Sequence, residues 1–141
     1  MAVTKNIFFS LVIFLLAVQK IDAQDSSIVK KIPAKSKVQY GIASFYSNKF
    51  NGRKTANGEI FSQQKFTAAH NSLPLGTYVR VTNLRNKRTV IVKINDRLHA
   101  RNKRLIDLTK AAAQKLGFIK SGLVRVKLEV LGKKPPSGNN K

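Results

Sequence analysis

The stretch Tyr78–Asp96, YVRVTNLRNKRTVIVKIND, contains two runs of β-forming residues separated by a short polar segment. β-branched and aromatic residues predominate in Tyr78–Thr82 and Val90–Ile94, which is typical of strands in a partly buried sheet. Leu84–Arg88, between them, has the length and composition of a hairpin loop. The stretch therefore predicts two antiparallel strands, the second of which ends beside the carboxylate of Asp96.

Other segments extend this pattern. Val124–Val130 alternates apolar with charged residues at a period of two, and Val38–Tyr46 is a further strand candidate, interrupted at Gly41. Thr109–Leu116 favours a helix, because its first residue can cap the N-terminus and Gly117 can close the other end. A mainly β chain with short strands, long loops and a small helix indicates either a barrel or a sandwich.

The composition restricts the function more than the fold. The 141 residues include 27 Lys and Arg against 6 Asp and Glu, a net charge of +21, which favours an anionic partner. The absence of Cys excludes disulfides and Cys-ligated metal sites, and two His with few carboxylates make a metal cage improbable. We therefore expect no metal site. The hydrophobic content of 43% is enough to bury a core.

The N-terminus has the features of a secretory signal peptide. Lys5 precedes Ile7–Val18, a run that is apolar except for Ser10 and too short to span a bilayer. Cleavage after Ala23 would export the protein to the periplasm or the extracellular cell wall, and the absence of Cys argues against a lipid anchor. Outside the cytoplasm, peptidoglycan and other anionic wall polymers are better partners than nucleic acid.

The rest of the chain divides into three parts. Residues 24–37 are polar and basic, and we expect a flexible lead-in there. Residues 38–132 form a single domain, which we expect to be monomeric. Residues 133–141, KKPPSGNNK, combine Pro, Gly and Asn with positive charge, and predict a disordered tail.

In a chain so poor in acids, each carboxylate within the domain needs an explanation. Glu59 follows turn-forming residues and is expected in a tight loop, either as a displayed functional group or as a surface charge. Asp96 lies where a strand leaves the sheet, which suits a cleft residue and equally a turn residue that caps backbone N–H groups. For Asp107 a structural role is favoured, at the start of the helix or paired with Arg104. His70, beside small apolar residues, is typical of a hydrogen-bonded structural histidine.

Two carboxylates and a histidine, without a Cys or Ser nucleophile motif, suit general acid–base catalysis on a glycosidic bond. A general acid must hold a proton, whereas a strongly positive field favours the ionised carboxylate. Burial or a second carboxylate nearby would have to oppose that field. We therefore expect Glu59 and Asp96 to be neighbours in one cleft.

At these residues the sequence resembles the rare lipoprotein A family of septal-ring lytic transglycosylases, from about Gly41 to Leu131. The resemblance rests on many ordered motifs over most of the domain. They are Gly41–Tyr46 (GIASFY), Thr55–Glu59 (TANGE), Thr67–His70 (TAAH), Leu73–Thr77 (LPLGT), Val81–Leu84 (VTNL), Asn95–Arg97 (NDR), Arg104–Leu108 (RLIDL), Ala111–Ala113 (AAA) and Leu116–Gly117 (LG).

The resemblance implies a six-stranded double-psi β-barrel with one or two short helices and a glycan-binding cleft. It implies that Asp96 is the catalytic acid and base, that Glu59 assists it or shares its proton, and that His70 orients a carboxylate or binds the sugar. The implied reaction is endolytic cleavage of peptidoglycan between N-acetylmuramic acid and N-acetylglucosamine, leaving 1,6-anhydro ends without cofactor or metal. The implied substrate-binding residues are Tyr46, Asn57, Asn95 and Arg97.

The sequence departs from the family in the loop beside the candidate acid. Leu98-His99-Ala100 stands where the family usually has Gly-Pro-aromatic, and Ser47 stands where Gly is usual. The altered loop favours one rival function, a non-catalytic expansin-like protein that binds wall polysaccharide. A second rival is a hydrolase that uses water, which needs a particular spacing of its carboxyl groups.

Overall fold

The structure, a computed structural model, describes residues 37–137. The predicted signal peptide, residues 24–36 of the predicted lead-in and residues 138–141 of the predicted tail lie outside the described residues. Within residues 37–137, no helix has the length and apolar character needed to cross a membrane. The elements in chain order are β1 (Val38–Phe45), the 3-10 turn η1 (Asn48–Phe50), β2 (Thr67–Ala69), β3 (Tyr78–Asn83), β4 (Thr89–Asp96), β5 (Ile106–Leu108), α1 (Lys110–Leu116) and β6 (Val124–Gly132).

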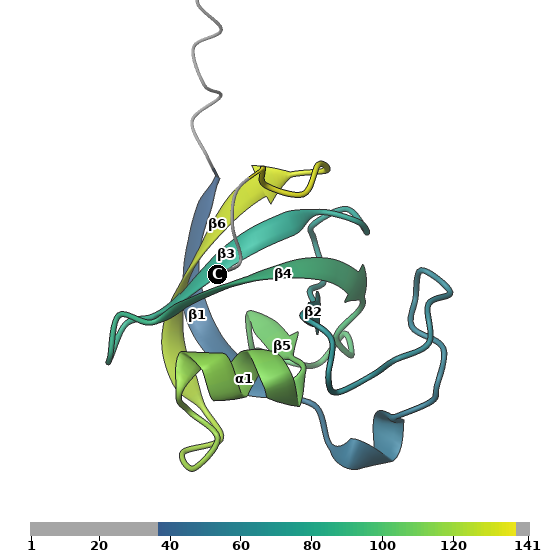
Figure 1. The fold of residues 1–141 in the computed structure, drawn as a ribbon, viewed down its shortest axis with the longest axis horizontal. Coiled ribbons are helices and arrows are strands. Elements are labelled where there is room, and N and C mark those ends of the chain that lie inside the picture. The colour runs from purple at the N-terminus through teal and green to yellow at the C-terminus, as the bar shows by residue number, and fades with distance from the viewer. Residues whose placement is uncertain (1–36, 138–141) are drawn as a thin grey trace, which may run out of the picture. The chain divides into compact units, whose positions relative to one another are not determined.

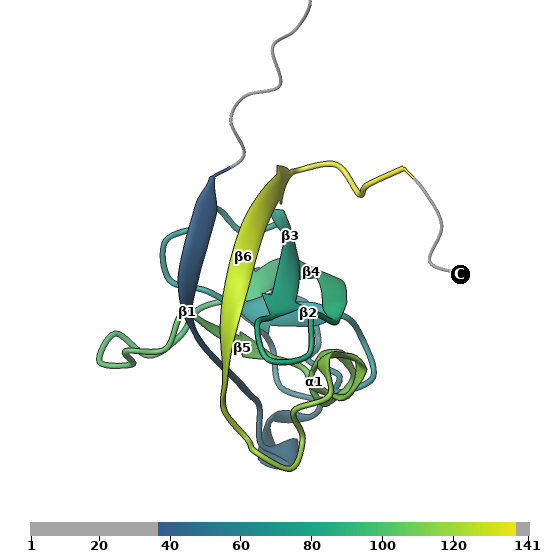
Figure 2. The same cartoon turned by 90° about the vertical axis from the view of Figure 1, so that its left-hand side faces the viewer.

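The six strands of residues 37–137 close into a barrel in the order β1-β5-β2-β4-β3-β6 (Figures 1 and 2). β1 lies parallel to β5 and β2 lies parallel to β4, while the other neighbours are antiparallel. Strands that are distant in sequence therefore pair side by side, which interlocks the two halves of the chain. The predicted fold class, a mainly β six-stranded barrel with short helical elements, is confirmed.

The hairpin predicted from Tyr78–Asp96 is confirmed. β3 and β4 pair in an unbroken antiparallel register, and Leu84–Arg88 forms the loop between them. Asn83 closes this loop, because its Oδ1 accepts a hydrogen bond from the Arg85 amide at 2.8 Å and its carbonyl accepts one from the Lys87 amide at 2.8 Å. The hairpin therefore fixes where β4 begins, and Asp96 lies at the opposite end of β4.

β1 continues through Gly41 without a break, so the predicted interruption is wrong. Gly41 pairs with Val126 of β6 inside a continuous antiparallel register. The residue is glycine because of a close approach: a Cβ at this position would lie 2.7 Å from the Cβ of Leu105. Leu105 is held there by a hydrogen bond from its amide to the carbonyl of Ile42 at 2.9 Å. The glycine therefore lets the chain entering β5 pack against β1.

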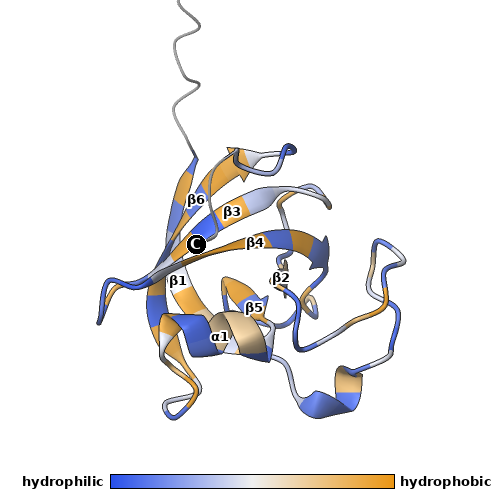
Figure 3. Ribbon diagram, viewed as in Figure 1, coloured by the Kyte–Doolittle hydropathy of each residue, from blue (hydrophilic) through white to orange (hydrophobic). Residues whose placement is uncertain are grey.

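The core receives buried side chains from all six strands of the barrel and from α1. Figure 3 shows where apolar residues occur along these elements. β2 and β5 are the two strands that the sequence pattern did not predict. Each has three residues, which is too short for a period of two to be recognised. The largest fully buried apolar side chains are Ile94, Ile106, Leu108, Leu116, Leu128, Val79, Val81, Val92 and Val126.

The predicted helix is confirmed as α1, together with both of its caps. The Oγ1 of Thr109 accepts a hydrogen bond from the Ala112 amide at 3.5 Å, and Gly117 ends the helix in the left-handed conformation at φ 74°. Ala112, Ala113 and Leu116 are buried on the face that packs against the barrel. The helix therefore covers the outside of the barrel.

Candidate active site

Asp96 is fixed by three hydrogen bonds at the point where β4 leaves the barrel. Its Oδ1 accepts from the backbone amides of Ala56 at 3.0 Å and Arg97 at 2.9 Å. Its Oδ2 accepts from the hydroxyl of Tyr46 at 2.7 Å. Since each carboxylate oxygen can accept about two hydrogen bonds, Oδ2 is the oxygen with remaining capacity for a further partner. The side chain is thus oriented with one oxygen occupied and the other available.

Tyr46 belongs to a small aromatic cluster. Its ring centroid lies 5.6 Å from that of Phe50 and 4.4 Å from that of Phe61. Burial, followed by the hydrogen bond to Asp96, raises the pKa of the Tyr46 phenol well above its ordinary value. Tyr46 therefore stays protonated and acts as a hydrogen-bond donor to the carboxylate throughout the physiological pH range.

A cleft of about 440 Å³ opens beside Asp96, which is a volume typical of small-ligand sites. Its walls come from the end of β1, η1, the end of β4 and the loop that follows β4. Leu98 and His99, from the segment that departs from the family pattern, take part in the wall, and Leu98 is buried. The lining residues are Phe45, Tyr46, Ser47, Phe50, Ala69, Asp96, Arg97, Leu98, His99, Asn102, Arg104 and Asp107.

Asp107 is paired with Arg104 in the wall of this cleft. The pair is bidentate, with Nε to Oδ1 at 2.8 Å and Nη2 to Oδ2 at 2.9 Å. The pairing anticipated from the sequence is observed. Both charges are compensated within the pair, so Asp107 is not a second free carboxylate beside Asp96.

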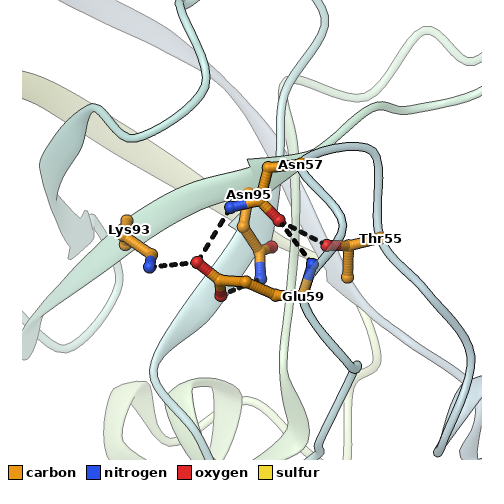
Figure 4. Close-up of polar contacts among 5 residues, drawn as sticks. All are labelled: Thr55, Asn57, Glu59, Lys93 and Asn95. Carbon is orange, nitrogen blue, oxygen red and sulfur yellow. Dashed lines mark hydrogen bonds and ion pairs between the residues drawn. The ribbon is translucent and has the colours of Figure 1, made fainter.

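Glu59 lies at the centre of a different polar cluster (Figure 4). Its Oε1 is ion-paired with the ammonium of Lys93 and accepts a hydrogen bond from the side-chain amide of Asn57 at 2.8 Å. Its Oε2 accepts one from the side-chain amide of Asn95 at 3.2 Å. The hydrogen bond from Lys93 is the main cause that lowers the pKa of Glu59 to about 2. Glu59 is therefore ionised at neutral pH.

These partners and the lowered pKa argue against a proton shared between Glu59 and Asp96, and leave the alternative that Glu59 assists Asp96. An ammonium and two amide donors stabilise the ionised form of a carboxylate and so disfavour its protonation. Glu59 also does not contribute to the lining of the cleft beside Asp96. The two acids are linked through the loop instead: the Asn57 amide donates to the Asn95 carbonyl at 3.1 Å, next to Asp96.

His70 is buried, and its ring forms hydrogen bonds with neither Asp96 nor Glu59. Its Nδ1 accepts hydrogen bonds from the amides of Ser72 at 3.1 Å and Leu73 at 3.2 Å. The ring proton therefore resides on Nε2, which donates to Oε1 of Gln39 at 2.9 Å. Burial is the main cause that lowers the pKa of His70, so the ring is neutral.

The backbone of His70 does reach the site. Its amide donates to the carbonyl of Asp96 at 3.1 Å, and its carbonyl accepts from Nη1 of Arg97 at 2.7 Å. Arg97 is exposed and lines the cleft, so it is positioned for contact with a ligand. The side-chain amides of Asn57 and Asn95 are turned toward Glu59 (Figure 4).

Two participants were missed from the sequence. Lys93 is the partner of Glu59, and a lone lysine inside the apolar run of β4 was a signal that a carboxylate lies opposite. Phe50 lines the cleft from η1, and no pattern in the sequence indicated that role. Across residues 37–137, no three histidine or acidic side chains gather into a group able to hold a metal ion.

A closed six-stranded barrel with two parallel strand pairs, and with a fixed carboxylate at the edge of a cleft, defines the class as a double-psi β-barrel with a candidate acid–base site. Residues 38–128 match the model of the family described as lytic transglycolase. The chain belongs to this family.

Individual relatives agree with this assignment. The chain is 52% identical over 98 residues to the endolytic peptidoglycan transglycosylase RlpA of Haemophilus influenzae, covering 70% of this chain and 34% of the relative. It is 57% identical over 91 residues to the protein of the same name from Pasteurella multocida, covering 64% and 31%. The chain thus spans about a third of the length of these curated relatives.

Among solved structures, the fold is similar to that of an expansin from Clavibacter michiganensis. The TM-score is 0.58 at 21% sequence identity, and the match covers 72% of this chain and 53% of the expansin. At this identity the similarity concerns the fold alone.

Proposed function

We propose that the protein is an endolytic lytic transglycosylase that cleaves peptidoglycan glycan strands between N-acetylmuramic acid and N-acetylglucosamine. The observation that carries the proposal is the carboxylate of Asp96, oriented by three hydrogen bonds at the wall of a cleft. Family membership supports it, as does the identity of about half of the aligned residues to relatives named peptidoglycan transglycosylases.

In the proposed reaction, Asp96 acts first as an acid and then as a base. In the form of the enzyme in which Oδ2 carries a proton, Oδ2 donates that proton to the oxygen between the two sugars, and the bond from C1 of the muramic acid to that oxygen breaks. The same carboxylate then takes the proton of the C6 hydroxyl, whose oxygen bonds to C1. One carbon–oxygen bond replaces another and no water is consumed, so the product carries a 1,6-anhydro end.

The surrounding residues support this chemistry by position. Tyr46 holds Oδ2 in place, and Arg97 is placed to bind the glycan. Positive charge develops on the sugar ring in the transition state. The Arg104–Asp107 ion pair reduces the unfavourable field there, because it compensates a cation in the cleft wall.

We assign Glu59 and His70 as positioning residues. Ionised Glu59 anchors the loop Thr55–Glu59 to β4, and that loop supplies the Ala56 amide to Asp96. His70 acts through its backbone, which contacts Asp96 and Arg97 on the far side of the strand end. The side chains of Asn57 and Asn95 contribute to the same loop attachment.

Action on peptidoglycan places the protein in the cell envelope. The signal peptide predicted from residues 1–23 supports export there, and the high positive charge supports contact with other anionic wall polymers. The closed barrel of residues 38–132 offers no free strand edge for pairing with another chain, which supports a monomer.

The test is to incubate the chain that begins at Gln24 with isolated glycan strands and to identify the products by mass. New 1,6-anhydro ends support the proposal, and new reducing ends would indicate a hydrolase instead.

The second candidate is an expansin-like wall-binding protein without catalysis. The segment Leu98–Ala100 departs from the family pattern, and two of its residues, Leu98 and His99, line the cleft; this is the observation that favours the second candidate. Co-sedimentation with peptidoglycan and the absence of any new end would select this candidate over the enzyme.

A further inference from the structure

One end of the barrel carries exposed cations with no nearby acid. The β3–β4 hairpin contributes Arg85, Lys87 and Arg88, the segment before β6 contributes Lys120, and the start of β6 contributes Arg125. All five side chains are exposed, and none has a carboxylate partner among residues 37–137. We call these five residues the cationic end; Figure 1 shows the hairpin and the segment before β6 on the same side of the molecule.

The cationic end is held together by hydrogen bonds between its two segments. The side-chain amides of Asn83 and Asn86 both donate to the carbonyl of Leu116, at 2.9 and 2.8 Å. The Leu84 amide donates to the Arg125 carbonyl at 3.0 Å. These bonds fix the hairpin against the C-terminus of α1 and the start of β6. The cations are therefore displayed on a defined surface.

Apolar side chains lie among these cations. Leu123 is 54% exposed and follows Gly122, whose φ is 71°. A hollow of about 410 Å³ next to it is lined by Leu84, Arg85, Leu123, Val124 and Arg125. A second hollow of about 410 Å³ is lined by Lys110, Gln114, Gly117, Ile119 and Lys120. Each hollow is thus lined by both apolar and cationic side chains.

We propose that the cationic end docks reversibly on a membrane surface rich in anionic phospholipid. Phosphate groups of the lipid bind the exposed Arg and Lys side chains, while Leu123 inserts among the acyl chains. A soluble polyanion would use the cations but would leave Leu123 in water. The exposed leucine between cations therefore favours a lipid surface over a dissolved polymer.

The hairpin of the cationic end is separated from the carboxylate of Asp96 by the length of β4. β4 begins at Thr89, next to the hairpin, and ends at Asp96 in the cleft wall. Its eight residues span about 23 Å at roughly 3.3 Å per step. The hairpin part of the cationic end and Asp96 therefore lie at opposite ends of β4, whereas Phe118, in the segment before β6, packs against the cleft residue Phe45 with ring centroids 5.8 Å apart. The docking itself does not depend on the proposed catalytic activity.

The test measures co-sedimentation with vesicles of phosphatidylglycerol and phosphatidylcholine, and with phosphatidylcholine alone. The protein is the chain from Gln24, which contains the whole barrel and lacks the apolar run Ile7–Val18, since that run would itself enter a bilayer. We expect binding to the anionic vesicles that weakens with salt, and no binding to the neutral ones.

Two variants locate the surface. Replacing Arg85 and Lys120 together by Gln should weaken vesicle binding roughly 25-fold, at about fivefold for each charge. The matched control, Lys65→Gln with Lys134→Gln, removes the same charge from exposed positions outside the cationic end and should weaken binding by no more than a few-fold. Equal losses in the two double variants would overturn the proposal, because binding would then follow net charge alone.

A third variant identifies the partner class. Leu123→Asn keeps every charge and should weaken vesicle binding about fivefold, because roughly half of a leucine side chain no longer enters the bilayer. With soluble polyphosphate as the probe, the same variant should bind as the unmodified chain does. If Leu123→Asn leaves vesicle binding unchanged, the surface binds polyanions in general and the lipid proposal is overturned.

Discussion

The hydroxyl of Tyr46 donates a hydrogen bond of 2.7 Å to Oδ2 of Asp96, although the two residues are 50 positions apart in the chain. β1 carries the tyrosine to one edge of the cleft, and β4 carries the aspartate to the same edge. The contact is a product of the closed barrel, because β1 and β4 are not neighbours in it. It fixes the oxygen that the proposed mechanism uses.

We expect Tyr46→Phe to lower turnover of glycan strands on the order of tenfold or more, which is the effect of losing a hydrogen bond to a charged group. The packing against Phe50 and Phe61 is kept, so the thermal unfolding temperature should change little. Turnover equal to that of the unmodified chain, in a folded variant, would mean that the orientation of Oδ2 is unimportant.

Glu59 should contribute to stability in a pH-dependent way. Its pKa is about 2 in the folded protein against an ordinary value of 4.5, so its ionised form stabilises the fold above about pH 4.5. This contribution is lost as the pH falls from 4.5 toward 2. Denaturant unfolding of Glu59→Gln should therefore show a lower free energy of unfolding than the unmodified chain at pH 6, and the two should converge at low pH. A difference that stays constant over this pH range would contradict the ion pair with Lys93.

Glu59 should also influence catalysis without titrating in it. We expect Glu59→Gln to lower kcat, because the loop that presents the Ala56 amide to Asp96 is held less firmly. In the pH profile of activity, the acidic limb of Glu59→Gln should lie at the same pH as that of the unmodified chain. A shift of that limb in the variant would show that Glu59 shares the catalytic proton after all.

Gly41→Ala should destabilise the barrel by about 1–3 kcal/mol, the usual cost of overpacking a well-packed site. The added Cβ would lie 2.7 Å from the Cβ of Leu105, and neither atom can move without shifting a backbone segment. Denaturant unfolding measures this effect. Unchanged stability would show that the chain entering β5 packs against β1 less closely than the structure indicates.

The long alternating strands and the helix could be predicted from the sequence alone. β3, β4 and β6 each bury one face, so their patterns are clear, and α1 has recognisable caps at Thr109 and Gly117. The three-residue strands β2 and β5 could not be recognised locally. They are strands because their neighbours in the barrel provide hydrogen-bond partners, which is a tertiary effect.

The candidate site was predicted in part. The position of Asp96 at a strand end and the pairing of Asp107 with Arg104 follow from local sequence. The environment of Glu59 does not, because Lys93 lies 34 residues away and approaches it through barrel closure. The sequence predicts another acid as the neighbour of Glu59, whereas in the structure Glu59 is ion-paired with Lys93.

The central claim is that Asp96 carries the proton in glycan cleavage, and Asp96→Asn tests it most directly. Asparagine keeps the size of the side chain but cannot transfer the proton, and Glu129→Gln is the matched control because it neutralises a carboxylate on β6 outside the cleft lining. Release of anhydro ends from glycan strands is measured for both variants and the unmodified chain. The account predicts that Asp96→Asn releases no detectable anhydro ends although it unfolds cooperatively as the unmodified chain does. It predicts that Glu129→Gln releases anhydro ends at the unmodified rate. Anhydro ends formed by Asp96→Asn at the unmodified rate would contradict it.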